Sequence, residues 1–173
     1  MKKNFWIKKN NCAGVTIVEL VIYLGILTIL LTIFTTIFTS VIDVQIESEA
    51  TSSVEQDRRF ILSRLIYDIT RAGSINTPYS LVVPNNQSNN LQITINGIPN
   101  SYTLDGNGNL ILTNNLGADM LNSYDTSISG LSFARIGNAG GKNTLQITFT
   151  LSSRTQRSGG SEVRNFQTTV GIR

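Results

Sequence analysis

Glu19 has the most unusual chemical setting near the N-terminus. It lies in the stretch NNCAGVTIVELVIYLGIL, residues 10–27, and no further charged residue follows it until Asp43. A carboxylate placed in a bilayer costs about 2.5–3.5 kcal/mol on insertion scales, so it normally has a partner or a function. The alternative without a specific function is an interfacial glutamate at a helix N-terminus, stabilised by the helix dipole and by contact with water. Which of the two applies depends on the residues that surround it.

No other part of the sequence offers a catalytic constellation. The chain has no histidine, and Cys12 is its only cysteine. This excludes triads with an imidazole base, most zinc sites and an intramolecular disulfide. A lipoprotein cysteine would follow an apolar run, whereas KNFWIKKNN precedes Cys12, so we do not expect lipidation. We expect no catalytic residue, no cofactor, no metal and no enzyme activity.

The positive charge of the chain is concentrated at its N-terminus. The net charge is +3, and four of the 14 Lys and Arg residues lie before residue 15, namely Lys2, Lys3, Lys8 and Lys9. The remainder has ten basic against 11 acidic residues and a net charge of −1. A basic chain would otherwise suggest nucleic acid or anionic lipid as a partner. We therefore expect no nucleic-acid partner.

Residues 20–42 have the length and composition of a membrane span. They contain no charge and as a helix would extend ~35 Å, against ~30 Å for the hydrocarbon core of a bilayer. Their threonines are tolerable because a helical threonine hydroxyl can bond back to a backbone carbonyl. Lysines on the N-terminal side predict that this end is cytoplasmic, with the bulk of the protein outside the cytoplasm.

The helix is predicted to continue beyond the span. Apolar residues recur at helical spacing, and Glu55 to Arg59 and Arg64 to Asp68 are spaced as solvated charge pairs. Gly73 supplies a stop, so one helix over residues 15–72 is the simplest interpretation. The apolar stripe comprises Val54, Ile61, Leu65, Ile69 and Ala72, widened by Leu62 and Ile66.

From residue 81 onward the pattern alternates, as in β-strands. Asn96 and Gly97 predict a tight hairpin, and the last strand pair turns through SSRTQRSGGS, residues 152–161. We expect an antiparallel sheet whose apolar face packs on the helix. The Asn-rich residues 85–90 and the Gly-rich residues 137–143 are predicted loops. The apolar strand positions are Leu91, Ile93, Ile95, Tyr102, Leu104, Leu110, Leu112, Leu131, Phe133, Ile136, Leu145, Ile147, Phe149, Leu151, Phe166, Val170 and Ile172.

The segment DGNGN, residues 105–109, resembles a calcium loop only superficially. An EF-hand needs Gly at the sixth position and Glu at the twelfth, where Leu110 and Leu116 stand. We expect a hairpin turn there.

The N-terminal segment differs from an ordinary secretory signal, whose small cleavage-site residues follow the apolar stretch. Here the small residues CAG come before it. Residues 1–42 resemble the class III signal of type IV pilins and type II secretion pseudopilins. That signal has a basic leader, a Gly, a hydrophobic first mature residue, Thr second, Glu fifth and then a long apolar helix. Those positions are Gly14, Val15, Thr16 and Glu19.

The resemblance implies a processing step and a set of partners. A membrane prepilin peptidase would cut between Gly14 and Val15 and N-methylate the new amine of Val15, with all catalytic residues belonging to the peptidase. Glu19 would pair with that amine on a neighbouring subunit and, with Thr16, set the register of assembly. The implied partners are the peptidase, other pilins or pseudopilins through the N-terminal helix, and an inner-membrane assembly platform.

Two further features indicate which kind of subunit this is. The family most often has Phe where this chain has Val15, and aliphatic residues occur there among minor members. The segments RRFILSRLIYDITRAGSI, residues 58–75, and VRNFQTTVGIR, residues 163–173, resemble J-type pseudopilins and W-type minor pilins. An amphipathic helix and an edge strand explain these two segments equally well.

Together these observations predict an α+β fold, with a long N-terminal helix whose second half packs on a C-terminal antiparallel sheet. The expected parts are a leader (1–14), a membrane and assembly half of the helix (15–42), an amphipathic half (43–73) and an extracytoplasmic β-rich part (74–173). The expected function is that of a minor pilin or pseudopilin in the inner membrane and then in a pilus or pseudopilus.

Two other functions compete with this one. The same anchored architecture would suit a binding module, either an adhesin or a DNA-uptake receptor. An enzyme with an ordinary signal peptide would use SEA, residues 48–50, as its cleavage site, but the apolar region is too long for such a signal.

Overall fold

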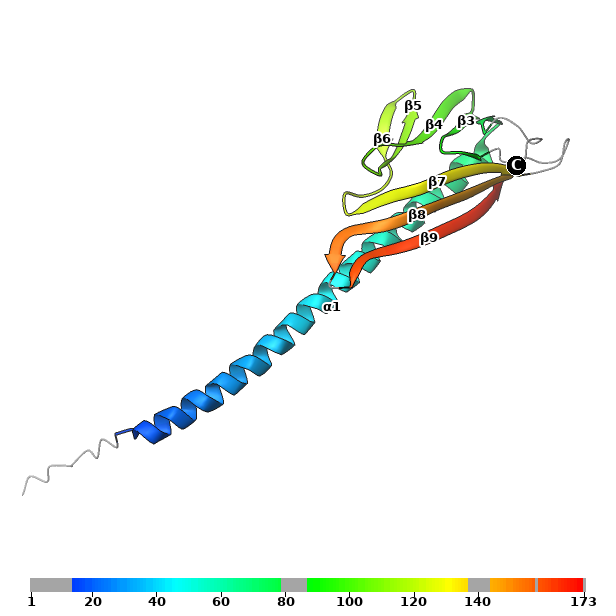
Figure 1. Ribbon diagram of the computed structural model, residues 1–173. Helices are drawn as coiled ribbons and strands as arrows, with labels where there is room; N and C mark the ends of the chain where they lie inside the picture. Colours follow the sequence, from blue (N-terminus) through cyan, green and yellow to red (C-terminus); the bar gives the residue numbers. More distant parts are fainter. Residues whose placement is uncertain (1–13, 79–86, 137–143, 158, 173) are drawn as a thin grey trace, which may run out of the picture. The chain divides into compact units, whose positions relative to one another are not determined.

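The protein is an α+β chain in which a long, apolar N-terminal helix contacts antiparallel β-sheets. The computed structural model describes residues 14–78, 87–136, 144–157 and 159–172. The chain divides into two compact units, Met1–Ile42 and Asp43–Arg173. The helix begins in the first unit, and its second half belongs to the second unit together with all the strands (Figure 1).

The described residues form one helix and nine strands. The predicted helix over residues 15–72 is confirmed to within two residues at each end. The elements are α1 (Ile17–Arg71), β1 (Ser74–Thr77), β2 (Gln87–Ser88), β3 (Leu91–Ile95), β4 (Ile98–Leu104), β5 (Leu110–Asn114), β6 (Gly117–Met120), β7 (Thr126–Ile136), β8 (Thr144–Arg157) and β9 (Gly160–Gly171).

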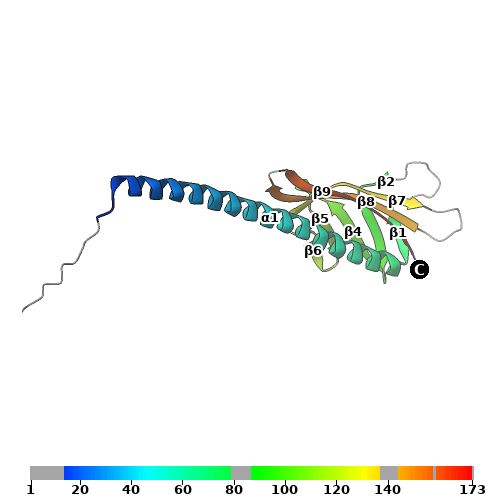
Figure 2. The ribbon, with the colours of Figure 1, turned by 90° about the horizontal axis from the view of Figure 1, so that it is seen from below.

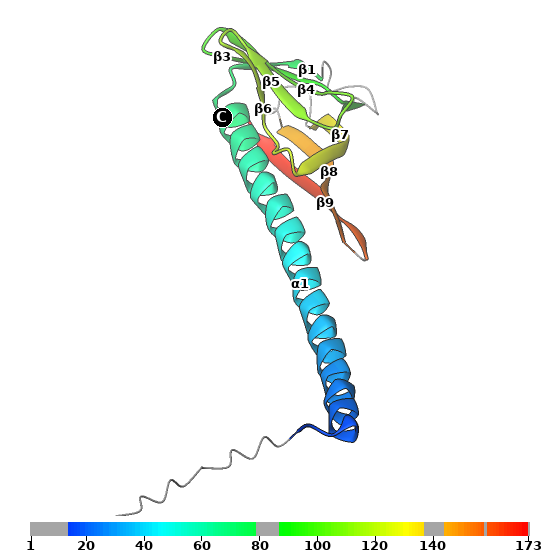
Figure 3. The same cartoon turned by 90° about the vertical axis from the view of Figure 1, so that its left-hand side faces the viewer.

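The strands form two antiparallel sheets, where the sequence pattern predicted one. The first has the order β1-β3-β4-β5-β6 and the second β2-β7-β8-β9. Figures 1 and 3 show β7, β8 and β9 side by side, with β3 to β6 grouped apart from them. Two sheets can pack their apolar faces on one helical stripe from different sides, which buries more of that stripe than a single sheet would.

Two predicted connections are partly strand. The Asn-rich residues 85–90 contain β2, which pairs with β7, so the described part of this segment is not simply a loop. Most residues of the predicted turn over residues 152–161 belong to strands, because β8 continues to Arg157 and β9 begins at Gly160. Polar strands such as these lack the alternation that a sequence search detects. The predicted loop at residues 137–143 lies outside the described residues.

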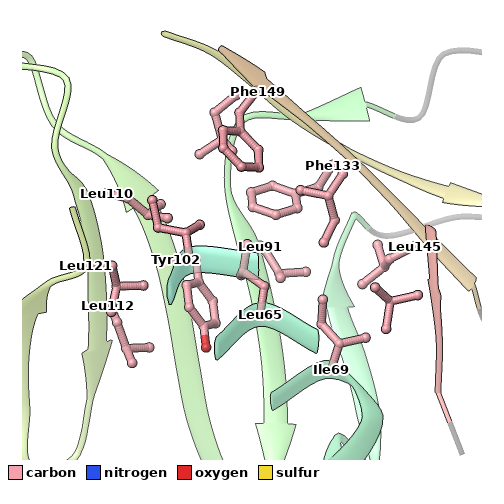
Figure 4. Packing of buried hydrophobic residues seen from close by; sticks show 14 of the residues in the cluster. Leu65, Ile69, Leu91, Tyr102, Leu110, Leu112, Leu121, Phe133, Leu145 and Phe149 are labelled. Atoms are coloured by element: carbon pink, nitrogen blue, oxygen red, sulfur yellow. The ribbon is translucent and has the colours of Figure 1, made fainter. Parts of the chain in front are cut away.

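The apolar stripe of α1 is the centre of the core. Its predicted members Val54, Ile61, Leu65, Ile69 and Ala72 are all buried. The second half of α1 runs past both groups of strands (Figure 2). Figure 4 shows side chains from α1, β3, β4, β5, β7 and β8 meeting in one interior.

The edge of the stripe differs from the prediction at one residue. Leu62 packs partly buried against the core, but Ile66 is 39% exposed and does not widen the stripe. Leu121, directly after β6, also belongs to the core. The strand residues of the core are Ile75, Leu91, Ile93, Tyr102, Leu110, Leu112, Ile128, Leu131, Phe133, Leu145, Ile147, Phe149, Leu151 and Val170.

Asp68 is buried on the same face of α1, so the prediction of a solvated Arg64–Asp68 pair is wrong for the carboxylate. Asp68 is 4% exposed and accepts a hydrogen bond from Arg64 Nε at 2.8 Å. Its Oδ2 also accepts a hydrogen bond from the hydroxyl of Tyr102 on β4. A buried carboxylate is tolerated when it is paired and hydrogen-bonded, as here. Asp68 thus joins α1 to the first sheet.

Asp57 makes a second buried link, three helical turns before the first. Its Oδ2 accepts hydrogen bonds from the backbone N–H and the hydroxyl of Ser123, both at 2.8 Å, and from the hydroxyl of Thr126. Ser123 lies between β6 and β7 and Thr126 begins β7, where the chain passes from one sheet to the other. The rotation of α1 about its own axis is therefore fixed at two points.

The predicted Glu55 to Arg59 pair exists and is part of a larger group. Glu55 Oε1 lies 3.1 Å from Arg59 Nε and 2.5 Å from Arg58 Nη2. The guanidinium of Arg58 also lies 5.4 Å from the ring centroid of Phe166 on β9. Hydrogen bonds from Arg58 and then Arg59 lower the pKa of Glu55 to about 2.

The two predicted hairpin turns are confirmed. Asn96 and Gly97 have φ of 51° and 81°, as a two-residue hairpin with positive φ at both positions requires. In the second turn Gly108 has φ of 78°, and a Cβ there would lie 3.0 Å from the carbonyl oxygen of Ile128. Glycine is required at this position by both its conformation and the close backbone approach.

We predict that Tyr102→Phe lowers stability by about 1.5–3 kcal/mol at neutral pH, because Asp68 loses a buried hydrogen-bond donor. Burial, and then the bond to Asp68, raise the pKa of the Tyr102 hydroxyl above its usual value. The unfolded chain loses this proton near pH 10 and the folded chain keeps it, so wild-type stability falls as pH rises above about 10. The variant lacks this contribution.

Urea unfolding of the full-length chain in detergent, followed by near-ultraviolet circular dichroism, measures both effects. Tyr124→Phe is the matched control because Tyr124 is 82% exposed. An alkaline slope equally steep in Tyr102→Phe and in the wild type would contradict the assignment.

Candidate functional site

Thr16 forms the N-terminal cap of helix α1. Its side-chain Oγ1 accepts a hydrogen bond from the backbone N–H of Glu19 at 3.2 Å, and its carbonyl accepts one from Leu20 N at 3.1 Å. A threonine with a glutamate three residues later has the spacing of a capping box. Thr16 therefore has a structural role at the helix start, which the sequence interpretation had not assigned to it.

Gly14 and Val15 precede the helix and are exposed. Neither residue is in regular secondary structure, and Val15 is 64% exposed. A Cβ added at Gly14 would meet no heavy atom within 4 Å. The peptide bond between them therefore lies in an uncovered segment without regular secondary structure, directly before the first helical turn.

Glu19 lies in the first turn of α1, and its carboxylate has a partner that the sequence analysis missed. The hydroxyl of Tyr23 donates a hydrogen bond to Glu19 Oε1 over 2.9 Å. The spacing of four residues places both side chains on the same face of the helix, so this spacing was the available signal. Glu19 is thus a carboxylate with one oxygen engaged within its own helix.

The rest of this half of the helix is predominantly apolar and carries no charged residue before Asp43. The described part of the unit Met1–Ile42 is exposed along its whole length, and the most apolar 18-residue window has a mean hydropathy of 2.6. α1 is therefore long and apolar enough to span a membrane.

The threonines of this half bond as predicted. Each hydroxyl donates to a backbone carbonyl one turn earlier, over 2.7–3.1 Å. These hydroxyls are thereby satisfied within the helix itself, as an apolar solvent requires. The threonines are Thr28, Thr32, Thr35, Thr36 and Thr39.

The residues before Gly14 lie outside the described part of the chain. This applies to Cys12 and to the four leader lysines, Lys2, Lys3, Lys8 and Lys9. Of the predicted site, the structure therefore places Gly14, Val15, Thr16 and Glu19.

The turn of residues 105–109 uses its oxygens internally. Asp105 Oδ1 accepts from the backbone N–H groups of Asn107 and Asn109, and Oδ2 accepts from Asn109 Nδ2. The bond from the Asn109 backbone is the main cause that lowers the pKa of Asp105. Arg154 closes the turn by donating to Asn107 O at 2.9 Å and Asn109 Oδ1 at 3.0 Å. The segment links the two sheets.

Among the described residues, no group of three or more His, Cys, Asp or Glu side chains is arranged to hold a metal ion.

Comparison with known proteins identified no relative of this chain. No protein-family model, no curated protein and no solved structure matches the chain.

We predict that Thr16→Val weakens the start of α1 by about 1 kcal/mol, because the amide of Glu19 loses its acceptor. Hydrogen exchange of that amide, measured by NMR on the chain in detergent micelles, should be about fivefold faster than in the wild type. Thr16→Ser keeps the oxygen and is the control. Equal exchange rates in the two variants would show that Oγ1 does not cap the helix.

Proposed function

We propose that the protein is a minor pilin or pseudopilin, a structural subunit rather than an enzyme. The observation that carries this proposal is the sequence of features at the helix start. An exposed Gly14–Val15 bond directly precedes a threonine-capped helix, and Glu19 lies in the first turn of an apolar, uncovered half. The other half of the same helix is the core of a folded β-rich unit.

Processing after Gly14 would supply a positively charged partner for Glu19. Cleavage turns the backbone nitrogen of Val15 into an α-amine, which is positively charged at neutral pH. Val15 lies two residues before α1, and Glu19 lies in the first turn of α1, so the amine and the carboxylate are four residues apart in each subunit. Pairing Glu19 with the amine of a neighbouring subunit offsets the cost of placing a carboxylate in an apolar interior.

The exposed apolar half of the helix accounts for two stages in the life of the subunit. Before assembly, residues 15–42 lie in the cytoplasmic membrane with the N-terminus inside and the β-rich part outside the cytoplasm. During assembly, packing against other N-terminal helices replaces lipid, with the Glu19 pairing setting the axial register. The destination is a type IV pilus or a type II secretion pseudopilus.

The proposed partners follow from these stages. A prepilin peptidase acts at Gly14 and Val15, other pilins or pseudopilins pack along the helix, and an inner-membrane platform drives assembly. If the subunit is of the J or W type, it joins other minor subunits in a complex at the filament tip.

We predict that the mature chain begins at Val15 and carries one added methyl group, as measured by intact mass of the membrane form. Gly14→Leu should leave a precursor of full length, because a bulky residue would not fit the peptidase. The substitution has room in the protein itself, since no heavy atom lies within 4 Å of the added Cβ. Gly25→Ala, which also has free space, is the matched control and should be processed.

Cys12 gives a second readout of the same step. It is the only cysteine and lies in the leader, so a maleimide label marks the precursor and not the mature chain. A mature start at Met1 or after Ala50 would overturn the proposed processing.

We predict that Glu19→Ala is processed normally but loses assembly, because the cut lies before the helix and the pairing forms between subunits. The mature chain is free of cysteine, so a single Leu31→Cys substitution allows bis-maleimide cross-linking of neighbouring helices in the native host. Cross-linked oligomers should disappear in the Glu19→Ala background. Glu49→Ala, which removes an exposed carboxylate further along α1, should assemble as the wild type does.

Normal cross-linking in Glu19→Ala would show that assembly does not depend on pairing by Glu19. A processed Leu31→Cys chain that is never cross-linked to another copy, even with Glu19 intact, would instead favour the membrane-anchored binding module.

A further inference from the structure

The hydroxyl of Tyr23 is used differently from the threonine hydroxyls that follow it. All five threonines that follow Tyr23 in the apolar half donate to backbone carbonyls of their own helix. Tyr23 instead donates to a side chain, the Oε1 atom of Glu19, over 2.9 Å. In an otherwise apolar segment, this bond joins a phenol to the carboxylate that the proposed function depends on.

The bond from Tyr23 uses one of the two carboxylate oxygens of Glu19. Among the described residues, Tyr23 is the donor to the Glu19 carboxylate, and it contacts Oε1. An ionised carboxylate has two oxygens and about four acceptor positions, so Oε2 can still accept from a charged donor. Because Tyr23 lies one turn further along the helix, its hydroxyl also restricts the rotation of the Glu19 side chain.

We propose that Tyr23 is a positioning residue for the intersubunit pairing of Glu19. Its hydroxyl holds Oε1 and presents Oε2 to the α-amine of a neighbouring processed subunit. This inference rests on the proposed function, since the amine exists only after cleavage at Gly14.

The arrangement serves the subunit before and after assembly. Before assembly, no α-amine of a neighbouring subunit lies beside Glu19 in the membrane. The phenol of Tyr23 then supplies a hydrogen bond to this carboxylate at the edge of the hydrocarbon. Tyrosine suits this depth because its ring is apolar and its hydroxyl is polar. In the assembled state, a carboxylate already fixed in one orientation loses less side-chain entropy when it meets the amine.

Tyr23→Phe tests the proposal because it removes the hydroxyl and keeps the ring. The matched control is Thr28→Val, which removes a hydroxyl that bonds to Leu24 O and does not touch Glu19. The first readout is infrared spectroscopy of the full-length chain in phosphatidylglycerol and phosphatidylethanolamine vesicles. Subtracting the spectrum of Glu19→Gln isolates the carboxyl band of Glu19 from those of the other four glutamates.

The infrared band should shift in Tyr23→Phe and stay in place in Thr28→Val, since hydrogen bonding changes the carboxyl stretch. This readout needs neither processing nor a filament, so it tests the Tyr23 contact separately from the proposed function. A Glu19 band unchanged by Tyr23→Phe would overturn the proposal.

The second readout is the yield of cross-linked oligomers from the Leu31→Cys chain. We expect about a tenfold loss in Tyr23→Phe, the size that follows from losing a hydrogen bond to a charged group. Processing, followed by intact mass, should be unchanged. In the Glu19→Ala background Tyr23→Phe should have no additional effect, because the group that it positions is absent.

A role as a plain aromatic anchor at the membrane surface makes the opposite prediction. Phenylalanine would then replace tyrosine without loss of oligomers, or would lower the yield equally with and without Glu19. Either result would overturn the positioning role.

Discussion

The fold of the β-rich unit depends on how the second half of α1 is rotated. The apolar stripe from Val54 to Ala72 serves both sheets, so a small rotation would expose part of the stripe to water and bury polar residues. Asp57 and Asp68 prevent this because each buried carboxylate is bonded to a separate part of the β-structure. Leaving either one unpaired in the interior would cost several kcal/mol, which makes other rotations unfavourable.

The two halves of α1 thus differ in the distribution of apolar residues around the helix. Its first half is predominantly apolar and, after Glu19, uncharged, as suits a helix solvated by lipid or by other helices. Its second half is apolar on one face only and uses the other face for water and ion pairs such as Glu55 with Arg58 and Arg59. The change falls at Asp43, the first charged residue after Glu19 and the first residue of the β-rich unit. The proposed function needs both halves in a single element.

The features that could be predicted from the sequence are local ones. The helix followed from a 3.6-residue period and from Gly73 after it, and the hairpins followed from Asn96–Gly97 and the turn at Gly108. Gly14, Val15, Thr16 and Glu19 are neighbours along the chain, so their order could be recognised directly. Tyr23 also lay within reach, at four residues from Glu19, but a tyrosine in an apolar run gives no signal of its own.

The features that could not be predicted depend on distant parts of the chain. Asp68 looked like half of a surface pair with Arg64, because its partner Tyr102 is 34 residues away. The partners of Asp57 are 66 and 69 residues away. The division into two sheets depends likewise on which strands pair, and β2 and β6 are too short and polar to show alternation.

The internal hydrogen bonds of Thr28 to Thr39 have a consequence for exchange between environments. Because each of these hydroxyls keeps its backbone acceptor, none of them is an unsatisfied donor, whether the neighbours of the helix are lipid chains or protein side chains. Moving it from one to the other breaks and makes no hydrogen bond along this stretch. The free-energy difference between the two surroundings then reduces to packing and to the single carboxylate at the helix start, so one ionic contact can decide the direction of transfer.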